Sequence, residues 1–268
     1  MTDSGAPTND FAAAQDRMRH VPEQIEPDAP LPAGDAGAEY PLNEQHLEDF
    51  QVGGVERSLP PTERLAQLVS YMENSYPVPS STDAEAIDRY LAALPDRLTH
   101  AAMLMLGSGL DHTMPGVAYG MDAETSELPE LGARLFAPAG DTTPTGQWAI
   151  AVHPEGFGPR AVEHYWRPLI AAVAQLTGTT IVDLDAPTTE AIDAALGYIS
   201  QQSPTATAIL AARAVEQHSA TLIDATPLTH PTPNHSSAGI GENQAGIIAT
   251  PEEFRRITAS VAETLRNS

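Results

Sequence analysis

Apolar positions between Gln147 and Pro187 predict a strand, a loop, a helix and a second strand. The first apolar run is Trp148 to Val152, and the second, rich in β-branched residues, is Thr179 to Leu184. Neither alternates with polar residues, which is typical of strands covered by helices on both faces. Ala161 to Leu176 has helical spacing between them. Strand, loop, helix and strand in about 40 residues match one parallel crossover unit, so we expect the centre of an α/β domain here.

Upstream of this unit, the pattern predicts helices and then one strand. Pro61 to Asn74 has helical apolar spacing with Thr62 as the expected N-cap. A second helix should start at Thr82 or Asp83, with its pattern resuming from Pro95 to Leu106. Its methionines, Met103 and Met105, are expected to fill the core. Leu131 to Pro138 alternates and ends at a turn, which predicts an antiparallel strand before the central unit.

Downstream, two more helices and three more strands are expected. The helices are Thr188 to Ile199 and Pro251 to Arg266, both with one apolar face. We expect an open, mostly parallel sheet in which Trp166 is buried and Tyr165 is partly buried. Its parallel strands should lie near Trp148 to Val152, Thr180 to Leu184, Thr207 to Leu210, Thr221 to Ile223 and Gly246 to Ile248.

Composition changes the picture mainly through charge. The 268 residues carry a formal charge of -23, with 13 basic residues, all arginine, against 36 acidic ones. Such a surface repels nucleic-acid phosphates and anionic membranes, so neither partner is expected. No cysteine is present, which excludes disulfides and thiolate chemistry. Without a targeting segment or a long apolar run, we expect a soluble, cytoplasmic protein without membrane insertion.

The same composition predicts the domain organisation. Residues 1–45 are polar, acidic and rich in Ala, Pro and Gly, so they are expected to form a disordered tail. Residues 46–268 then form one domain, with a helical lead-in or cap over 46–115 and the sheet with its flanking helices over 116–268.

The central unit also carries a family resemblance. An apolar strand ends in His153, its loop contains Gly156 and Phe157, the helix contains Trp166 to Pro168, and the next strand ends at Val182 to Asp185. This arrangement resembles the α/β-hydrolase fold, in particular the esterases, lipases and acetyl-hydrolases related to hormone-sensitive lipase. The resemblance implies a three-layer α/β/α architecture, here truncated, and a small ester or acyl ligand as a possible partner.

In the resembling family, a His-Gly-Gly-Gly loop holds the oxyanion of acyl transfer with its backbone amides. The corresponding loop here runs from His153 to Phe157. By resemblance, His153 should brace the loop through backbone hydrogen bonds, and the amides of Gly156 and Phe157 form the remnant of the oxyanion site. Pro154 has no amide hydrogen, and Glu155 adds a carboxylate where an anion would be stabilised.

The nucleophile of that family lies in a Gly-x-Ser-x-Gly turn, which this sequence lacks. The turn after the expected strand Thr207 to Leu210 reads Ala211 to Val215, which offers neither a nucleophile nor the glycines of a tight elbow. A displaced serine, Ser200 or else Ser203, is the alternative.

The remaining triad positions follow in the family order. Asp224 ends a predicted strand, and His230 or His235 lies beyond it. Ser200, Asp224 and His230 are therefore the candidate catalytic residues. The two histidines could also suggest a metal site, but no third ligand accompanies them, so we expect neither a metal nor a cofactor.

A loop between Gly107 and Met121 contains three further polar candidates, Ser108, Asp111 and His112. Adjacent side chains seldom act on one atom, so a structural role is favoured for this Asp-His pair.

Three functions stay open, and the enzymatic status with them. The favoured one is a catalytically impaired or non-catalytic α/β-hydrolase homologue, a pseudoenzyme that binds a ligand or partner. The alternatives are a serine carboxylic-ester hydrolase, like an esterase or lipase, and a structural or assembly protein.

Overall fold

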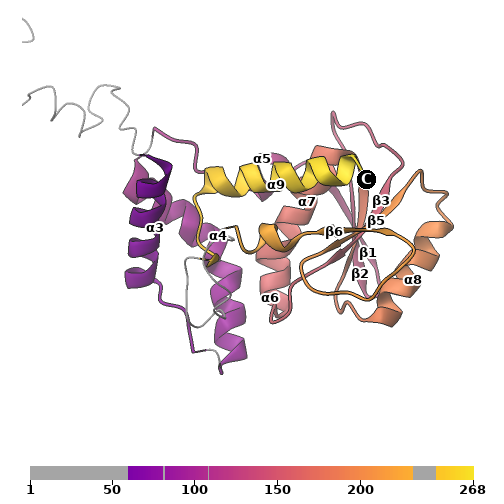
Figure 1. Cartoon of the computed structure of the whole chain (residues 1–268), viewed down its shortest axis with the longest axis horizontal. Helices are drawn as coiled ribbons and strands as arrows, with labels where there is room; N and C mark the ends of the chain where they lie inside the picture. The colour runs from indigo at the N-terminus through magenta and orange to yellow at the C-terminus, as the bar shows by residue number, and fades with distance from the viewer. Residues whose placement is uncertain (1–59, 81, 108, 232–245) are drawn as a thin grey trace, which may run out of the picture. The chain divides into compact units, whose positions relative to one another are not determined.

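Six strands form one mixed sheet in the order β1-β2-β4-β3-β5-β6 (Figure 1). The computed structural model describes residues 60–231 and 246–268, apart from residues 81 and 108. The strands β3, β4, β5 and β6 are mutually parallel, whereas β1 pairs antiparallel with β2, and β2 with β4. The strands are β1 Glu124–Leu128, β2 Ala133–Ala137, β3 Trp148–Val152, β4 Thr180–Leu184, β5 Thr207–Ala211 and β6 Thr221–Asp224.

Helices cover both faces of the sheet, so the expected α/β class is confirmed. Figure 1 shows α8 on one side of the strands and α6 and α7 on the other. Alternate residues of β3 serve the two sides: Ala149 and Ala151 join the core with α7 and α9, and Ile150 and Val152 join the core with α8. The bounds are α6 Pro159–Ala161, α7 Arg167–Thr177, α8 Thr189–Ser200 and α9 Pro251–Arg266. Two-sided burial explains the unbroken apolar runs of the central strands.

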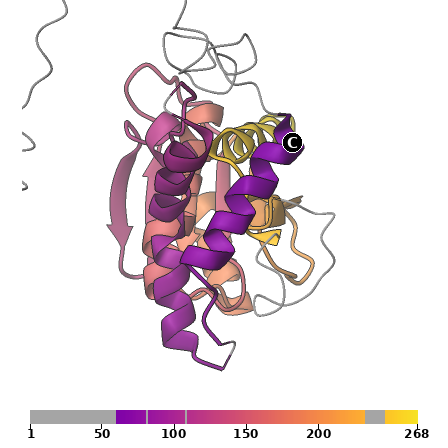
Figure 2. The same ribbon diagram turned by 90° about the vertical axis from the view of Figure 1, so that its left-hand side faces the viewer.

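The lead-in consists of two helices that pack on each other, α3 Pro61–Ser75 and α4 Ala84–Leu106 (Figure 2). Asp83 caps α4 by accepting a hydrogen bond from the amide of Ala86, as expected. The N-cap of α3 is Pro60 instead of Thr62. Pro61 causes the shift, because its fixed φ suits the first helical position and needs no amide partner.

Between β3 and β4, the crossover is helical but not uniformly α-helical. α6 is followed by a π-helix, η1 Val162–Trp166, which continues into α7. The crossover ends at Gly178, whose φ of 72° is left-handed. Trp166 is fully buried as expected, and Tyr165, at 1% exposed, is buried more completely than expected.

A carboxylate of the lead-in holds the start of this crossover. Asp88 of α4 accepts hydrogen bonds from the amides of Ala161, at 2.7 Å, and Arg160, at 3.3 Å. These amides lie in the first turn of α6 and have no partner within the helix. Gly158 makes the approach possible, because a Cβ there would lie 2.5 Å from the Asp88 carboxyl carbon. Asp88 thereby acts as an N-cap from a distant helix.

The sheet differs from the prediction in two ways. The predicted strand near Gly246 to Ile248 is absent from the described residues, since 246–250 pair with no strand. Ile247 and Ile248 are apolar because they are buried in the core as the chain enters α9, which Thr250 caps. Conversely, β1 was not predicted: most of its residues are exposed, so it has no apolar period.

The described residues form one compact unit. The expected tail, residues 1–45, lies outside the described residues. No described helix is both long and apolar enough to cross a membrane.

Candidate functional site

The first candidate region is the edge of the sheet at the carboxyl ends of the parallel strands. His153 directly follows β3, and its Nδ1 lies 3.0 Å from the carbonyl oxygen of Pro154. Its Nε2 lies 3.4 Å from the carbonyl oxygen of Asp185, just beyond β4. A neutral ring donates to one of these carbonyls at a time. The expected backbone bonding of His153 is therefore confirmed, and it links the ends of two neighbouring strands.

The loop after His153 holds its two candidate residues differently. Gly156 is exposed with a φ of 80°, a left-handed conformation suited to glycine. Phe157 turns its ring toward the core and stacks on Tyr165, with centroids 5.6 Å apart. Among the described residues, neither amide donates a hydrogen bond. Two amides are thus free at this loop, while Pro154 contributes none.

The candidate catalytic residues Ser200, Asp224 and His230 are not brought together. Ser200 is the exposed last residue of α8, and its hydroxyl donates to the carbonyl of Gly197 at 2.7 Å. Because α8 returns the chain from the end of β4 to the start of β5, Ser200 lies at the amino edge of the parallel strands. Asp224 ends β6 at the opposite edge. The expected triad with Ser200 is therefore corrected.

The acid and base candidates also have local partners of their own. Asp224 accepts a hydrogen bond from the amide of Thr226 at 2.9 Å, which closes a turn. The Nδ1 of His230 lies 3.2 Å from the hydroxyl oxygen of Thr229, and burial lowers the pKa of His230. Ser203, the alternative serine, follows α8 on the same side as Ser200, and its φ is 54°. The alternative His235, like Ser108, lies outside the described residues.

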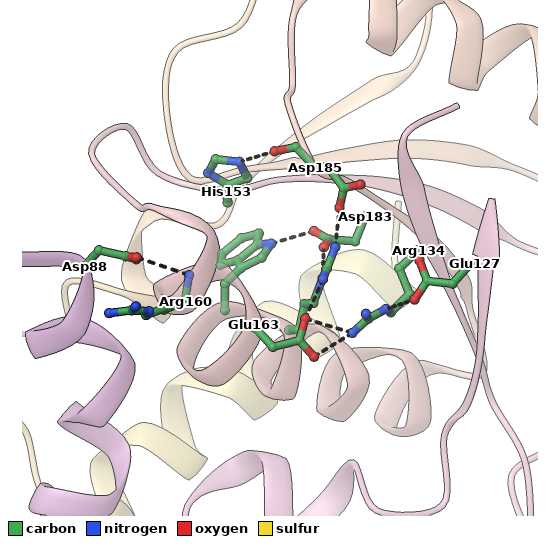
Figure 3. A network of polar contacts seen from close by, with 10 residues as sticks. Asp88, Glu127, Arg134, His153, Arg160, Glu163, Asp183 and Asp185 are labelled. Carbon is green, nitrogen blue, oxygen red and sulfur yellow. Dashed lines mark hydrogen bonds and ion pairs between the residues drawn. The ribbon is translucent and has the colours of Figure 1, made fainter. Parts of the chain in front are cut away.

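A buried ionic network occupies the crossover beneath this edge (Figure 3). Asp183 of β4 is fully buried and accepts hydrogen bonds from Trp166 Nε1, at 2.7 Å, and Arg167 Nε, at 3.0 Å. Arg167 also binds Asp185, and it donates to Glu163 at 2.6 Å. Three carboxylates thus surround one guanidinium.

The network sets the protonation of its members. Burial raises the pKa of Asp183 to about 6, although the bonds from Arg167 and Trp166 act against this change. Burial acts to lower the pKa of Arg167, but bonds to Glu163 and Asp183 outweigh it, and the pKa is raised. Every strong donor is already committed, so the network is structural. No described group of three or more His, Asp or Glu residues suits a metal ion.

The second candidate region is an apolar cavity of about 680 Å³. Its walls come from the second half of α4, the segment around α5 Pro115–Tyr119, and the crossover at η1 and α7. The lining residues are Pro95, Asp96, Thr99, Met103, Leu110, Asp111, His112, Thr113, Met114, Gly116, Val117, Met121, His164, Tyr165, Pro168 and Leu169. The candidate catalytic residues do not line it.

Exposed apolar side chains mark this cavity. Met103, Val117 and Met121 are 52%, 61% and 74% exposed. The expectation that Met103 fills the core is therefore wrong, whereas Met105 packs against the core. The helical period placed both methionines correctly on α4 but could not show that the face of Met103 has no covering element.

The backbone conformation of α5 and η1 shapes the wall of this cavity. A Cβ on Gly116 of α5 would lie 2.4 Å from Pro168 Cβ, so a glycine allows α5 to approach α7 closely. The π-helix η1 directs His164 outward to the cavity, while its neighbours Tyr165 and Trp166 are buried. π-helical turns occur often at functional sites.

Two of the polar candidates from the sequence line this cavity. His112 is buried, and its Nε2 lies 2.7 Å from the carbonyl oxygen of Gly107. Asp111 accepts a hydrogen bond from the amide of Thr113 at 2.9 Å and pairs with Arg255 at 3.4 Å. Both act as local structural groups. Of the site candidates named from the sequence that the structure describes, Asp111 and His112 are the ones that line this cavity.

Comparisons with known proteins give no match: no family model fits the chain, and neither a curated protein nor a solved structure is significantly similar.

Proposed function

We propose that the chain is a non-catalytic protein of the α/β-hydrolase type that binds a small apolar ligand between α4, α5 and the crossover helices. The cavity carries this proposal. Its volume of about 680 Å³ lies within the range of small-molecule sites, and its walls are mainly aliphatic with a few polar groups. Three exposed apolar side chains at its mouth would gain burial when a ligand binds.

The geometry of the carboxyl edge supports the absence of hydrolysis. Acyl transfer needs a nucleophile within hydrogen-bond reach of its base. Ser200 lies at the other edge of the sheet from His230, and Pro154 replaces an amide donor of the oxyanion loop. Loss of one such donor typically costs about 10²–10³ in rate. A short-chain p-nitrophenyl ester should be turned over no faster by the wild type than by Ser200→Ala.

Ligand binding can be tested with a neutral, apolar naphthylamine dye whose fluorescence rises on burial. The wild type should bind it saturably. Met103→Ala, which removes a wall residue, should weaken binding about fivefold, as expected for about 1 kcal/mol of lost apolar contact.

Leu104→Ala is the matched control. Leu104 is the next residue on α4 and is 58% exposed, close to the 52% of Met103, but it does not line the cavity. Its dye affinity should equal that of the wild type. Absence of saturable binding, or equal losses in the two variants, would overturn the proposal.

A further inference from the structure

The charged residues that line the apolar cavity are all acidic. Two carboxylates, Asp96 and Asp111, line it, and both residues are exposed at its mouth. Its two histidines are His112 and His164. Neither lysine nor arginine is among the lining residues. The electrostatic potential at the mouth is therefore negative.

Asp111 has a cationic partner that is fully engaged. Arg255 of α9 pairs with Asp111 at 3.4 Å, and it donates to the carbonyl oxygens of Asp111, at 3.0 Å, and Thr113, at 2.5 Å. Asp96, by contrast, has neither a hydrogen bond nor an ion pair within the described part of the chain. An unpaired carboxylate thus stands at the rim of an apolar cavity, next to Thr99 and Met103 on the same face of α4.

An apolar ligand in this cavity would hold its polar end at the rim. A carboxylate or phosphate end would meet Asp96 and find no arginine or lysine among the described lining residues, whereas an ammonium end would gain a charged partner. We propose that the ligand is a cationic amphiphile, an aliphatic chain with a protonated amine, whose chain fills the cavity and whose ammonium group pairs with Asp96. This inference rests on the proposed ligand-binding function and names the chemistry of the ligand.

The test compares three probes of equal chain length, decylammonium, decanol and decanoate, below their critical micelle concentrations. Each displaces the naphthylamine dye from the full chain at about pH 8, where ordinary histidines are neutral. Decylammonium should bind about two- to fivefold more tightly than decanol, the range of an exposed ion pair. Decanoate should bind more weakly than decanol.

Two variants separate a local pairing from the attraction of the whole acidic surface. Asp96→Asn should abolish the preference for decylammonium over decanol and leave decanol binding unchanged. Glu263→Gln removes the same charge from an exposed position of α9 that does not line the cavity, so the preference should persist. Circular dichroism checks that both variants are folded.

The possible failures are distinguishable. Equal or tighter binding of decanol or decanoate, or a preference that survives Asp96→Asn, would overturn the cationic ligand but leave the binding site. Failure of the dye and all three probes to bind would overturn the proposed function itself.

Discussion

At the scale of single residues, Arg167 has the most demanding environment. It neutralises Asp183, which is fully buried, and it also binds Glu163 and Asp185. A buried carboxylate that loses its cation must either remain charged at a high cost or take up a proton.

Arg167→Met should therefore lower the free energy of unfolding by about 3–5 kcal/mol at neutral pH, because Asp183 is left without its guanidinium. Denaturant unfolding followed by circular dichroism measures the change. Arg134→Met is the control: Arg134 lies opposite Asp183 in the β2–β4 pairing, but its side chain bonds Glu163 and Glu127 and not the Asp183 carboxylate, so the substitution should cost about 1 kcal/mol or less. Equal costs would contradict the role assigned to Arg167.

The pKa of Asp183 makes a second, pH-dependent prediction. Its folded-state pKa of about 6 lies above the ordinary value of 3.8. A raised pKa means that the folded protein holds the proton more tightly, so the stabilising contribution is complete below pH 4 and is lost as pH rises to about 6.

The free energy of unfolding of the wild type, minus that of Asp183→Asn, should thus fall by about 2 kcal/mol between pH 4 and 6. Glu163 is present in both proteins, so its opposite pH dependence largely cancels. Asp185→Asn is the control, because Asp185 is a more exposed partner of Arg167. The difference in free energy of unfolding between the wild type and this variant should change less between pH 4 and 6. A difference that stays constant or rises with pH would refute the raised pKa.

At the scale of elements, the spacing of apolar residues predicted those helices and strands that are buried on one side or on both. The helices α3, α8 and α9 and the strands β3 to β5 follow from apolar spacing, because the core that they bury imposes it. The strand β6 was also predicted, although only Ile223 of it is buried. The strand β1 escaped prediction because it is exposed and shows no apolar period. The π-helix η1 escaped because one widened turn shifts the helical period by a single residue.

The candidate site was harder to predict than the fold. A cavity depends on the distance between elements, here the second half of α4, α5 and the crossover, which no local pattern records. Asp111 and His112 were recognised as polar residues in a loop, but their place in the cavity wall was not. The prediction of Ser200 as a nucleophile was wrong for a topological reason. A helix between parallel strands ends at the amino edge of the sheet, whereas Asp224 and His153 lie at the carboxyl edge.

Alanine substitutions at two glycines of neighbouring crossovers should change the stability of the protein in opposite directions. Gly178→Ala at the end of α7 should cost at least about 2 kcal/mol, because left-handed φ alone costs about 1–2 kcal/mol for alanine. Its new Cβ would also lie 2.5 Å from the Thr143 carbonyl oxygen.

Gly197→Ala is the paired measurement. Gly197 lies inside α8 with open space around a built Cβ, so alanine should stabilise the protein by about 0.5–1 kcal/mol through helix propensity. Thermal unfolding of both variants checks the signs. Destabilisation by both substitutions would mean that α8 is more tightly enclosed than described.

At the scale of the whole molecule, Asp88 joins the lead-in helices to the sheet. Its buried carboxylate accepts hydrogen bonds from two amides of α6, so α4 and the crossover share polar contacts as well as an apolar core. Asp88→Ala should cost about 1–2 kcal/mol, the value of a lost N-cap.

The loss should be local in effect. Amide hydrogen exchange should become faster in α3, α4 and the first turn of α6, while β3, β4 and β5 keep their protection. Asp88→Asn, which retains one acceptor oxygen, should show a smaller change. Uniformly faster exchange across the sheet would contradict a role confined to this joint.

The two partners of the contact between Asp88 and the crossover are synthesised at different times. Its carboxylate and the amide of Ala161 are 73 positions apart in sequence. A ribosome that adds about 5–20 residues per second completes α4 several seconds before that amide is synthesised. During this interval, the face of α4 that packs against α6 and η1 in the folded protein has neither element to cover it.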